Sequence, residues 1–274
     1  MSKFFKILFL FCAFAISVNA QEDCMIENQI FYPGEKITFE GAYNWGPVWL
    51  RAGEATFALN EAELDGKALY HLVGEGKTFE SYNWVYRVED VYQSYIDKET
   101  LLPYKFIRDV DEGGHIIQNR YTFNHKENLL NIDQLKTNDH LKKKDESMYI
   151  PDCTHDVLSA VFYVRNIDYT QLEIGESVAF KIMIDAEVFN VSIVYHGIEE
   201  KKIKGGERYN CHKITFELIA GTIFEDGQTM TVWATADKNK IPVMVESPLI
   251  IGKAKFFATA YEGLQYPMEA KIEK

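Results

Sequence analysis

The sequence predicts a mainly β protein made of two related, strongly curved antiparallel sheets, barrel-like or sandwich-like, with one short helix. Three observations support this fold class. Strand-length segments in which apolar and polar residues alternate recur along the chain, as in "VAFKIMI" at residues 178–184. Glycine-containing turn pairs separate many of these segments. A set of motifs also occurs twice in the same order, which indicates an internal duplication.

Residues 1–20 have the pattern of a secretory signal peptide. Lys3 and Lys6 give a positive start, an unbroken apolar run follows at 7–16, and small side chains precede a cleavage point after Ala20. We therefore expect export to the periplasm or the outer cell envelope. Cys24 lies beyond that point, so lipidation is not expected. No transmembrane segment is expected after signal cleavage, because no later stretch has the ~18 consecutive apolar residues that a spanning helix needs.

The composition is acidic, with 29 basic and 41 acidic residues and a formal net charge of −12. Such a chain repels nucleic acids and anionic lipid surfaces, so no nucleic acid partner is expected.

Cys12 lies in the signal peptide, which leaves Cys24, Cys153 and Cys211. One disulfide with one buried thiol and three buried thiols are both compatible with export. The absence of a C-x-x-C motif disfavours a redox motif or a structural zinc site.

Two parts of the chain carry the same motifs at an almost constant offset. "GEKITF" at 34–39 corresponds to "GESVAF" at 175–180, and "DKETLLP" at 97–103 to "DKNKIP" at 237–242. The offset between matching positions stays within 139–141 residues. A run of lysines at 142–144 indicates a solvated segment between the copies. The predicted organisation is a signal peptide at 1–20, a first β repeat at 21–130, a polar connector at 131–150, and a helix with a second β repeat at 151–274.

Each repeat is expected to hold about six strands. A Gly-Glu pair opens the first strand, in which alternate residues are apolar and face one side of the sheet. Turn pairs such as Asp65 and Gly66 then close hairpins, because they tolerate positive φ. The aspartates that open the two repeated phrases are expected to start turns. Pro103 and Pro242 lack a backbone donor, so each should begin a strand or lie at a sheet edge.

One helix is expected, within residues 153–168. Thr154 is available as its N-cap, Asp156 lies in the first turn, and Arg165 near the end suits the negative pole of the helix dipole. An apolar stripe at helical spacing is formed by Val157, Leu158, Val161 and Phe162. We expect this helix to plug or cover one sheet. A thiol, an imidazole and a carboxylate lie together at its start, but neighbours on one turn rarely reach catalytic geometry, so capping is favoured.

No catalytic, metal-binding or cofactor-binding motif is found. The chain has no G-x-S-x-G, H-E-x-x-H, P-loop or G-x-G-x-x-G pattern, and its histidines form no short ligand pairs. We therefore expect no catalytic residue, no metal and no cofactor. A carbohydrate-active enzyme is an alternative, since such enzymes need two carboxylates about 5–9 Å apart. The carboxylates considered are Glu75, Glu80, Glu89, Asp90, Asp109, Asp111 and Glu112.

Aromatic residues of the first repeat form the candidate ligand-binding site. The segments "YNWGPVW" at 43–49 and "SYNWVYRV" at 81–88 carry three of the chain's four tryptophans. Aromatic side chains that line a concave sheet can bind a lipid chain or stack on sugar rings. Core packing is the alternative explanation of the same residues. The candidate ligand-binding residues are Tyr43, Trp45, Trp49, Tyr82 and Trp84.

Longer motifs carry a family resemblance. They read "PGEKITFEGAYNWGPVWLRAGEATF", "SYIDKETLLPYKFIRDVDEGG", "DVLSAVFYVRNIDY" and "GTIFEDGQTMTVWATADKNKIPVMVESPLIIGKAK". These stretches resemble an exported bacterial family known as domain of unknown function 3108. The resemblance covers nearly the whole mature chain and implies a β-rich envelope protein without an assigned activity. The D-x-x-x-L-L-P strand with its glycine hairpin is also similar, more faintly, to periplasmic lipoprotein carriers of the half-barrel type.

The leading functional hypothesis is an exported, non-catalytic envelope protein that binds a hydrophobic or envelope-derived ligand on a curved, aromatic-lined sheet. Lipid, lipoprotein and glycan are the ligand classes considered. A protein-interaction scaffold of the cell envelope, whose edge strands pair with a partner, is the second hypothesis. The carbohydrate-active enzyme is the third.

Overall fold

The structure is a computed structural model that describes residues 24, 26, 28–45, 48–84, 86–136, 142–217, 228–249 and 252–273. The predicted signal peptide at 1–20 and its cleavage point lie outside the described residues. The first half of the chain contributes β1 (Lys36–Trp45), β2 (Val48–Leu64), β3 (Lys67–Thr78), η1 (Glu80–Tyr82), β4 (Val88–Asp97), β5 (Pro103–Glu112), β6 (His115–Asn124), β7 (Leu129–Lys136) and β8 (Lys142–Tyr149). The second half contributes β9 (Thr154–His155), α1 (Val157–Asn166), η2 (Tyr169–Gln171), β10 (Ser177–Ile184), β11 (Glu187–Lys202), β12 (Arg208–Glu217), β13 (Thr229–Thr235), β14 (Pro242–Pro248), β15 (Lys253–Glu262) and β16 (Lys271–Ile272).

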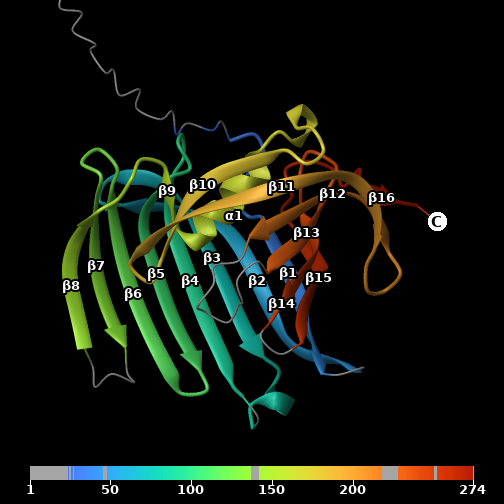
Figure 1. Ribbon diagram of the computed structural model, residues 1–274, viewed down its shortest axis with the longest axis horizontal. Helices are drawn as coiled ribbons and strands as arrows, with labels where there is room; N and C mark the ends of the chain where they lie inside the picture. Colours follow the sequence, from blue (N-terminus) through green and yellow to red (C-terminus); the bar gives the residue numbers. More distant parts are fainter. Residues whose placement is uncertain are drawn as a thin grey trace, which may run out of the picture.

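All these strands belong to one sheet (Figure 1). Its order is β8-β7-β6-β5-β4-β3-β2-β1-β15-β14-β13-β12-β11-β10-β9, with β16 paired to β12. β1 pairs with β15 in antiparallel register, from Lys36 opposite Glu262 to Tyr43 opposite Ala254. This pairing joins the two halves, because it satisfies the open edge that each half would otherwise expose. Within the described residues, the mainly β class with one α-helix is therefore confirmed, whereas the two expected sheets are one continuous sheet.

The repeated phrases fold into matching turns. β5 begins at Pro103 and β14 at Pro242, as their missing backbone donors predict. Asp97 and Asp237 each accept a hydrogen bond at 3.0 Å from the backbone N–H two residues further on. Six strands, β1–β6, lie in the first predicted copy, and six, β10–β15, lie in the second. The internal duplication itself stays a prediction.

The segment predicted as a polar connector at 131–150 forms strands instead. β7 and β8 continue the sheet as a hairpin beside β6. The alternate residues Leu130 and Ile132 are fully buried, in one core cluster with Tyr121 and Phe123. The neighbouring polar residues Asn131 and Asp133 are exposed on the other face, and such polar positions hide the strand pattern in the sequence.

The sheet curls until the β10–β11 hairpin crosses the inner face of β5 and β6 (Figure 1). Met183, near the end of β10, packs in the core cluster that contains Tyr121. The backbone N–H of Ala186 donates to Tyr121 Oη at 3.1 Å, and Arg108 Nη1 lies 2.9 Å from Asp185 Oδ1. The strand order nevertheless ends at β8 and β9, so the curved sheet is not closed.

α1 lies on the concave face of the curl (Figure 1). Its N-cap is Asp156, whose side chain accepts the backbone N–H groups of Leu158 and Ser159 in a capping box. Thr154 does not cap the helix as predicted; its hydroxyl donates to the carbonyl of Pro151 at 2.7 Å. A Cβ on Gly74 would lie 3.1 Å from Leu158 Cδ2, so this glycine lets the helix approach β3 closely. The prediction that the helix covers the sheet is confirmed.

A disulfide joins Cys24 to Cys153, and Cys211 is a buried free thiol. This is the first of the two cysteine arrangements that the sequence left open. The bond holds the N-terminal segment near the start of α1, where the rings of Phe31 and Phe162 lie 4.5 Å apart. Within the described ranges, no helix has both the length and the apolar character needed to cross a bilayer.

Candidate functional site

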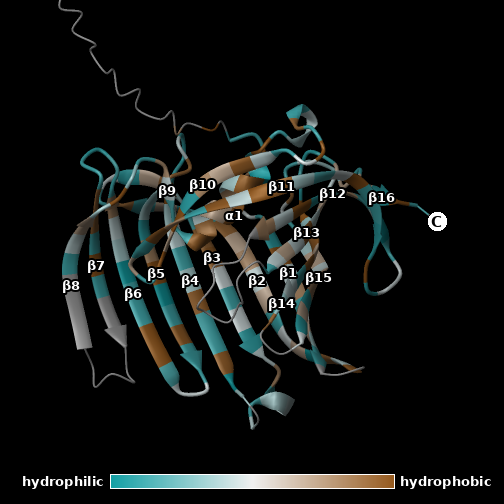
Figure 2. Cartoon of the chain, in the orientation of Figure 1, coloured by the Kyte–Doolittle hydropathy of each residue, from teal (hydrophilic) through white to brown (hydrophobic). Residues whose placement is uncertain are grey.

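An apolar cavity of about 360 Å³ lies between α1 and the concave face of the sheet. One wall comes from β1 and β2, through Phe39, Ala55 and Phe57. The opposite wall comes from β12 and β13, and includes Ile214 and Val232. The strand period of two produces this surface, because every second residue of each strand faces the inside of the curl. Figure 2 shows apolar residues on α1 and on the strands around it.

The helix leaves an apolar side chain uncovered inside this space. Leu158 and Phe162 are buried against β2–β4, and Phe162 also borders the cavity. Val161 lines the cavity and is 39% exposed. An apolar side chain in such a position gains free energy when a ligand removes it from water. Val161 is thus available for contact with an apolar molecule.

Charged groups gather at the inner end of the cavity and are paired within the protein. Arg165 on α1 donates to Glu35 and also, through Nη2 at 2.9 Å, to the carbonyl of Asn239. Lys240 Nζ donates to the carbonyl of Ile167 at 2.6 Å, and burial lowers the pKa of this lysine. Arg165 and Lys240 thus each have a hydrogen-bond acceptor within the protein, although Arg165 Nε is buried without a partner among the described residues.

The other end of the cavity is more exposed. Phe216, Met230 and Phe256 are half-buried, whereas Val164 and Tyr169 near the inner end are buried. In the strand register, Phe216 lies opposite Met230 near the end of β12, and β15 begins just before Phe256. The cavity therefore opens toward the end of the sheet where β1 turns into β2 and β14 into β15.

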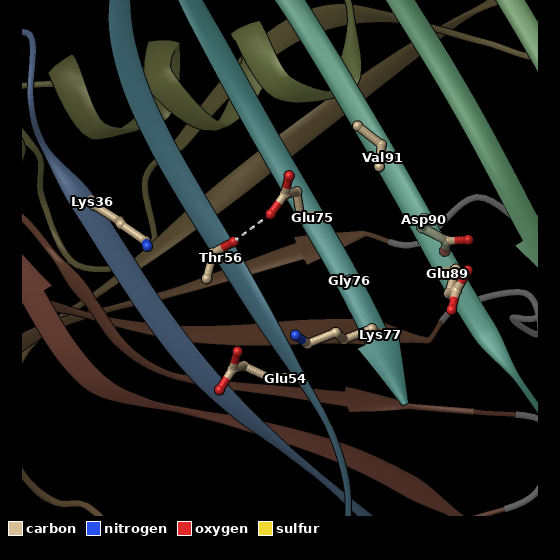
Figure 3. A pocket seen from close by; sticks show the side chains of 9 residues that line it. All are labelled: Lys36, Glu54, Thr56, Glu75, Gly76, Lys77, Glu89, Asp90 and Val91. Carbon is tan, nitrogen blue, oxygen red and sulfur yellow. Dashed lines mark hydrogen bonds between the residues drawn. The ribbon is translucent and has the colours of Figure 1, made fainter. Parts of the chain in front are cut away.

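A second depression, of about 400 Å³, is polar and lies over β1–β4 (Figure 3). Figure 3 shows side chains of both signs side by side on neighbouring strands, among them Lys36, Glu54, Glu75, Lys77 and Glu89. Lys77 stands opposite Glu54 on one side and Glu89 on the other. Within the described part of the chain, no group of three or more His, Cys, Asp or Glu residues is arranged to hold a metal ion. The mixed charges are those of a solvated sheet surface.

The aromatic residues predicted to bind ligand lie at the open end of the sheet. Tyr43 is half-buried near the end of β1, of which Trp45 is the last residue. Trp49 is exposed at the start of β2, with Lys255 Nζ 4.5 Å from its ring centroid. Tyr82 ends η1, and Trp84 follows in the loop to β4. Among the described side chains, none of these lines the cavity, and their role in ligand binding stays a prediction.

The strand residues that form the cavity wall are not among the predicted site residues. Phe39, Phe57 and Phe256 occupy alternate apolar positions of their strands, the pattern of any half-buried strand. The signal that could have found them is the repeated phenylalanine at inward positions of neighbouring strands. That signal alone does not separate a cavity wall from a packed core.

These features define a class: a β-barrel-like protein with an apolar cavity under one helix. A solved structure described as a beta-barrel-like protein of domain of unknown function DUF1849 from Brucella abortus is similar, with a TM-score of 0.57 and 7% sequence identity. The match covers 86% of this chain and 98% of that chain, and at such low identity it shows the fold alone. The family model described as protein of unknown function (DUF3108) matches residues 38–259, so the chain belongs to that family, as its motifs predicted. Comparison with curated proteins finds no match.

Proposed function

We propose that this protein is an exported, non-catalytic binding protein of the cell envelope that holds an elongated apolar ligand, such as an acyl chain. The observation that carries the proposal is the apolar cavity between α1 and the concave face, whose volume of about 360 Å³ lies within the range of about 300–1,000 Å³ common for small-molecule sites. The disulfide between Cys24 and Cys153 supports export, because such bonds persist in oxidising compartments.

The chemistry of the two cavity ends indicates how such a ligand would enter. Arg165 already has Glu35 and a backbone carbonyl, and Lys240 has the carbonyl of Ile167, so the inner end does not require a ligand charge. An acyl chain would therefore enter with its apolar end first. Its polar group would stay at the open end, where water can solvate it, because burial of an unpaired polar group is costly.

Binding of the neutral apolar dye N-phenyl-1-naphthylamine tests the proposal by fluorescence. Ala55→Phe fills the cavity from β2, and Val161→Gln places an amide in it with little change in the fold. Both variants are expected to weaken dye binding at least tenfold. Ala68→Phe is the matched control, since Ala68 is an exposed position of β3 outside the cavity. Circular dichroism checks that each variant folds, and equal dye binding by all variants would contradict the proposal.

One observation favours a second function, a scaffold that binds a partner by strand addition. β8 ends the strand order, and within the described residues no strand pairs with its outer edge. Ser147→Pro on β8 would remove a backbone donor from this strand. A partner that cross-links to the parent protein and not to this variant would support the scaffold function, and equal cross-linking would oppose it.

A further inference from the structure

Exposed aromatic and apolar side chains gather at the open end of the cavity. Trp84 is 85% exposed and Tyr86 is 52% exposed, both in the loop between η1 and β4. Val48 and Trp49 are exposed where β2 begins, and Ile116 is exposed where β6 begins. We call these five residues the aromatic rim. Figure 1 shows the η1 loop and the β1–β2 end on the same side of the sheet, away from the N-terminal segment.

Backbone contacts hold the turns of the aromatic rim side by side. The N–H of Phe79 donates to the carbonyl of Ala52 at 3.0 Å, which ties the η1 loop to β2. The N–H of Gly113 donates to the carbonyl of Arg87 at 2.8 Å, which ties the same loop to the β5–β6 turn. A Cβ on Gly113 would lie 2.7 Å from a ring carbon of Tyr86. A larger residue at this position would therefore clash with the ring. The exposed rings therefore form one defined edge.

Ion pairs surround the aromatic rim, and acidic side chains such as Asp111 and Glu112 are in excess there. Arg87 pairs with Glu89, and Arg51 at the start of β2 pairs with Glu40. Lys253, which begins β15, lies 3.3 Å from Glu246. Glu80 in η1 adds a negative charge, so this end does not favour an anionic surface. Paired charges next to exposed Trp and Tyr suit the mixed charges of zwitterionic headgroups, because these rings concentrate at the membrane–water interface.

We propose that the aromatic rim docks onto a zwitterionic lipid bilayer surface, with Trp84 and Tyr86 in the headgroup region and the cavity mouth facing the bilayer. The orientation of the cavity mouth rests on the proposed function, because a mouth that faces the bilayer gives an acyl chain a route into the cavity. The docking itself depends only on the aromatic rim. The interaction is peripheral, because it uses side chains at one edge of the protein.

Flotation with phosphatidylcholine vesicles tests the docking. The parent protein is expected to float with the vesicles, and its tryptophan fluorescence should be quenched by brominated phosphatidylcholine. Trp84→Ser with Tyr86→Ser should weaken vesicle binding at least tenfold. The matched control is Tyr149→Ser with Ile174→Ser, which removes two equally exposed apolar residues away from the aromatic rim and should leave binding unchanged. Equal loss in both double variants would overturn the proposal.

Further measurements separate docking from other uses of the same edge. Vesicle binding should persist in 0.5 M salt, because contacts of uncharged rings with lipid are not screened by salt. Binding only to anionic vesicles, and only at low salt, would overturn the docking proposal. Self-association that the Trp84→Ser and Tyr86→Ser variant abolishes, without vesicle binding by the parent, would assign the edge to a second copy instead. Dye binding by that variant should equal the parent's. Vesicle binding without any dye binding would leave the docking intact and remove the proposed function.

Discussion

Arg165 on α1 and Glu35 before β1 form a buried bidentate ion pair, with Nη1 2.6 Å from Oε1 and Nη2 3.0 Å from Oε2. The pair joins the helix to the strand that links the two halves of the sheet. It also closes the inner end of the cavity. Together with the packing of Leu158 and Phe162, the pair holds α1 on the sheet.

Arg165→Met is expected to lower the free energy of unfolding by about 3–5 kcal/mol, because it leaves the Glu35 carboxylate buried without its partner. Glu35→Gln combined with Arg165→Met removes both charges and should recover most of that loss. Chemical denaturation followed by circular dichroism measures both values. A double variant that is less stable than Arg165→Met alone would contradict this explanation.

The strands and turns could be predicted because their signals are local. Pro103 and Pro242 mark strand starts through their missing donors, and the aspartate turns before them recur at a fixed offset. The pairing of β1 with β15 could not be predicted, since it joins edges that lie more than 200 residues apart in the chain and only the three-dimensional curl brings them together. β7 was missed because polar residues alternate with its core residues Leu130 and Ile132 and are as numerous in the strand as apolar ones.

The candidate site was harder to predict than the fold. The clustered tryptophans predicted a site at the aromatic rim, where Trp84 lies, and not at the cavity. The cavity lies between α1 and the wall that includes Phe39 and Phe57. No local sequence pattern encodes the distance between the helix and this wall. Whether an inward phenylalanine touches a neighbour or faces a cavity is settled by how the helix packs.

Loss of the disulfide should destabilise the protein substantially. Cys24 and Cys153 are separated by 129 residues, and a bond that closes a loop of this size contributes about 5 kcal/mol by restricting the unfolded chain. Cys24→Ser, Cys153→Ser and the double variant should all lose the same amount, since each removes one shared bond. Thermal unfolding with and without reductant measures it. Additive losses in the double variant would show that the cysteines act separately.

The remaining thiol should be inert in the folded protein. Burial raises the pKa of Cys211 to about 12, and its side chain is fully covered. In protein prepared without residues 1–20, which hold Cys12, iodoacetamide at pH 8 should therefore label no cysteine in the native state, and Cys211 alone after unfolding without reductant. Mass spectrometry of the labelled peptides gives the answer. Rapid native labelling of Cys211 would show that the core around it opens.

His155 should make the protein sensitive to acid. Burial, and to a smaller extent the nearby His125, lower the pKa of His155 to about 3, and its Nδ1 has no hydrogen-bond partner. In the unfolded chain this ring takes up a proton near pH 6.5, so its protonation favours unfolding as the pH falls from about 6.5 to about 3. His155→Phe keeps a ring beside Tyr163 without a titrating group. At pH 4 the variant should lose about 3 kcal/mol less stability than the parent, relative to pH 8; parallel stability curves would contradict this.

Asp90 should have the opposite dependence on pH. Burial and repulsion from Glu112 raise the pKa of its carboxyl to about 6, although Arg108 opposes the shift, and Oδ1 has no hydrogen-bond partner. The folded protein therefore holds a proton that the unfolded chain releases at lower pH, so this group's contribution to stability falls as the pH rises from about 4 to about 6. Asp90→Asn should equal the parent in stability at pH 4 and exceed it at pH 8 by about 1 kcal/mol, a value reduced from the full shift because the side chain is partly exposed to solvent.

Glu112→Gln should give a smaller stability change of the same sign. Combined with Asp90→Asn it should add nothing further, because both substitutions act on the ionisation of the Asp90 carboxyl. Urea denaturation at several pH values measures these differences, and a stability gain for Asp90→Asn that is the same at pH 4 and pH 8 would show that its cause is packing and not charge.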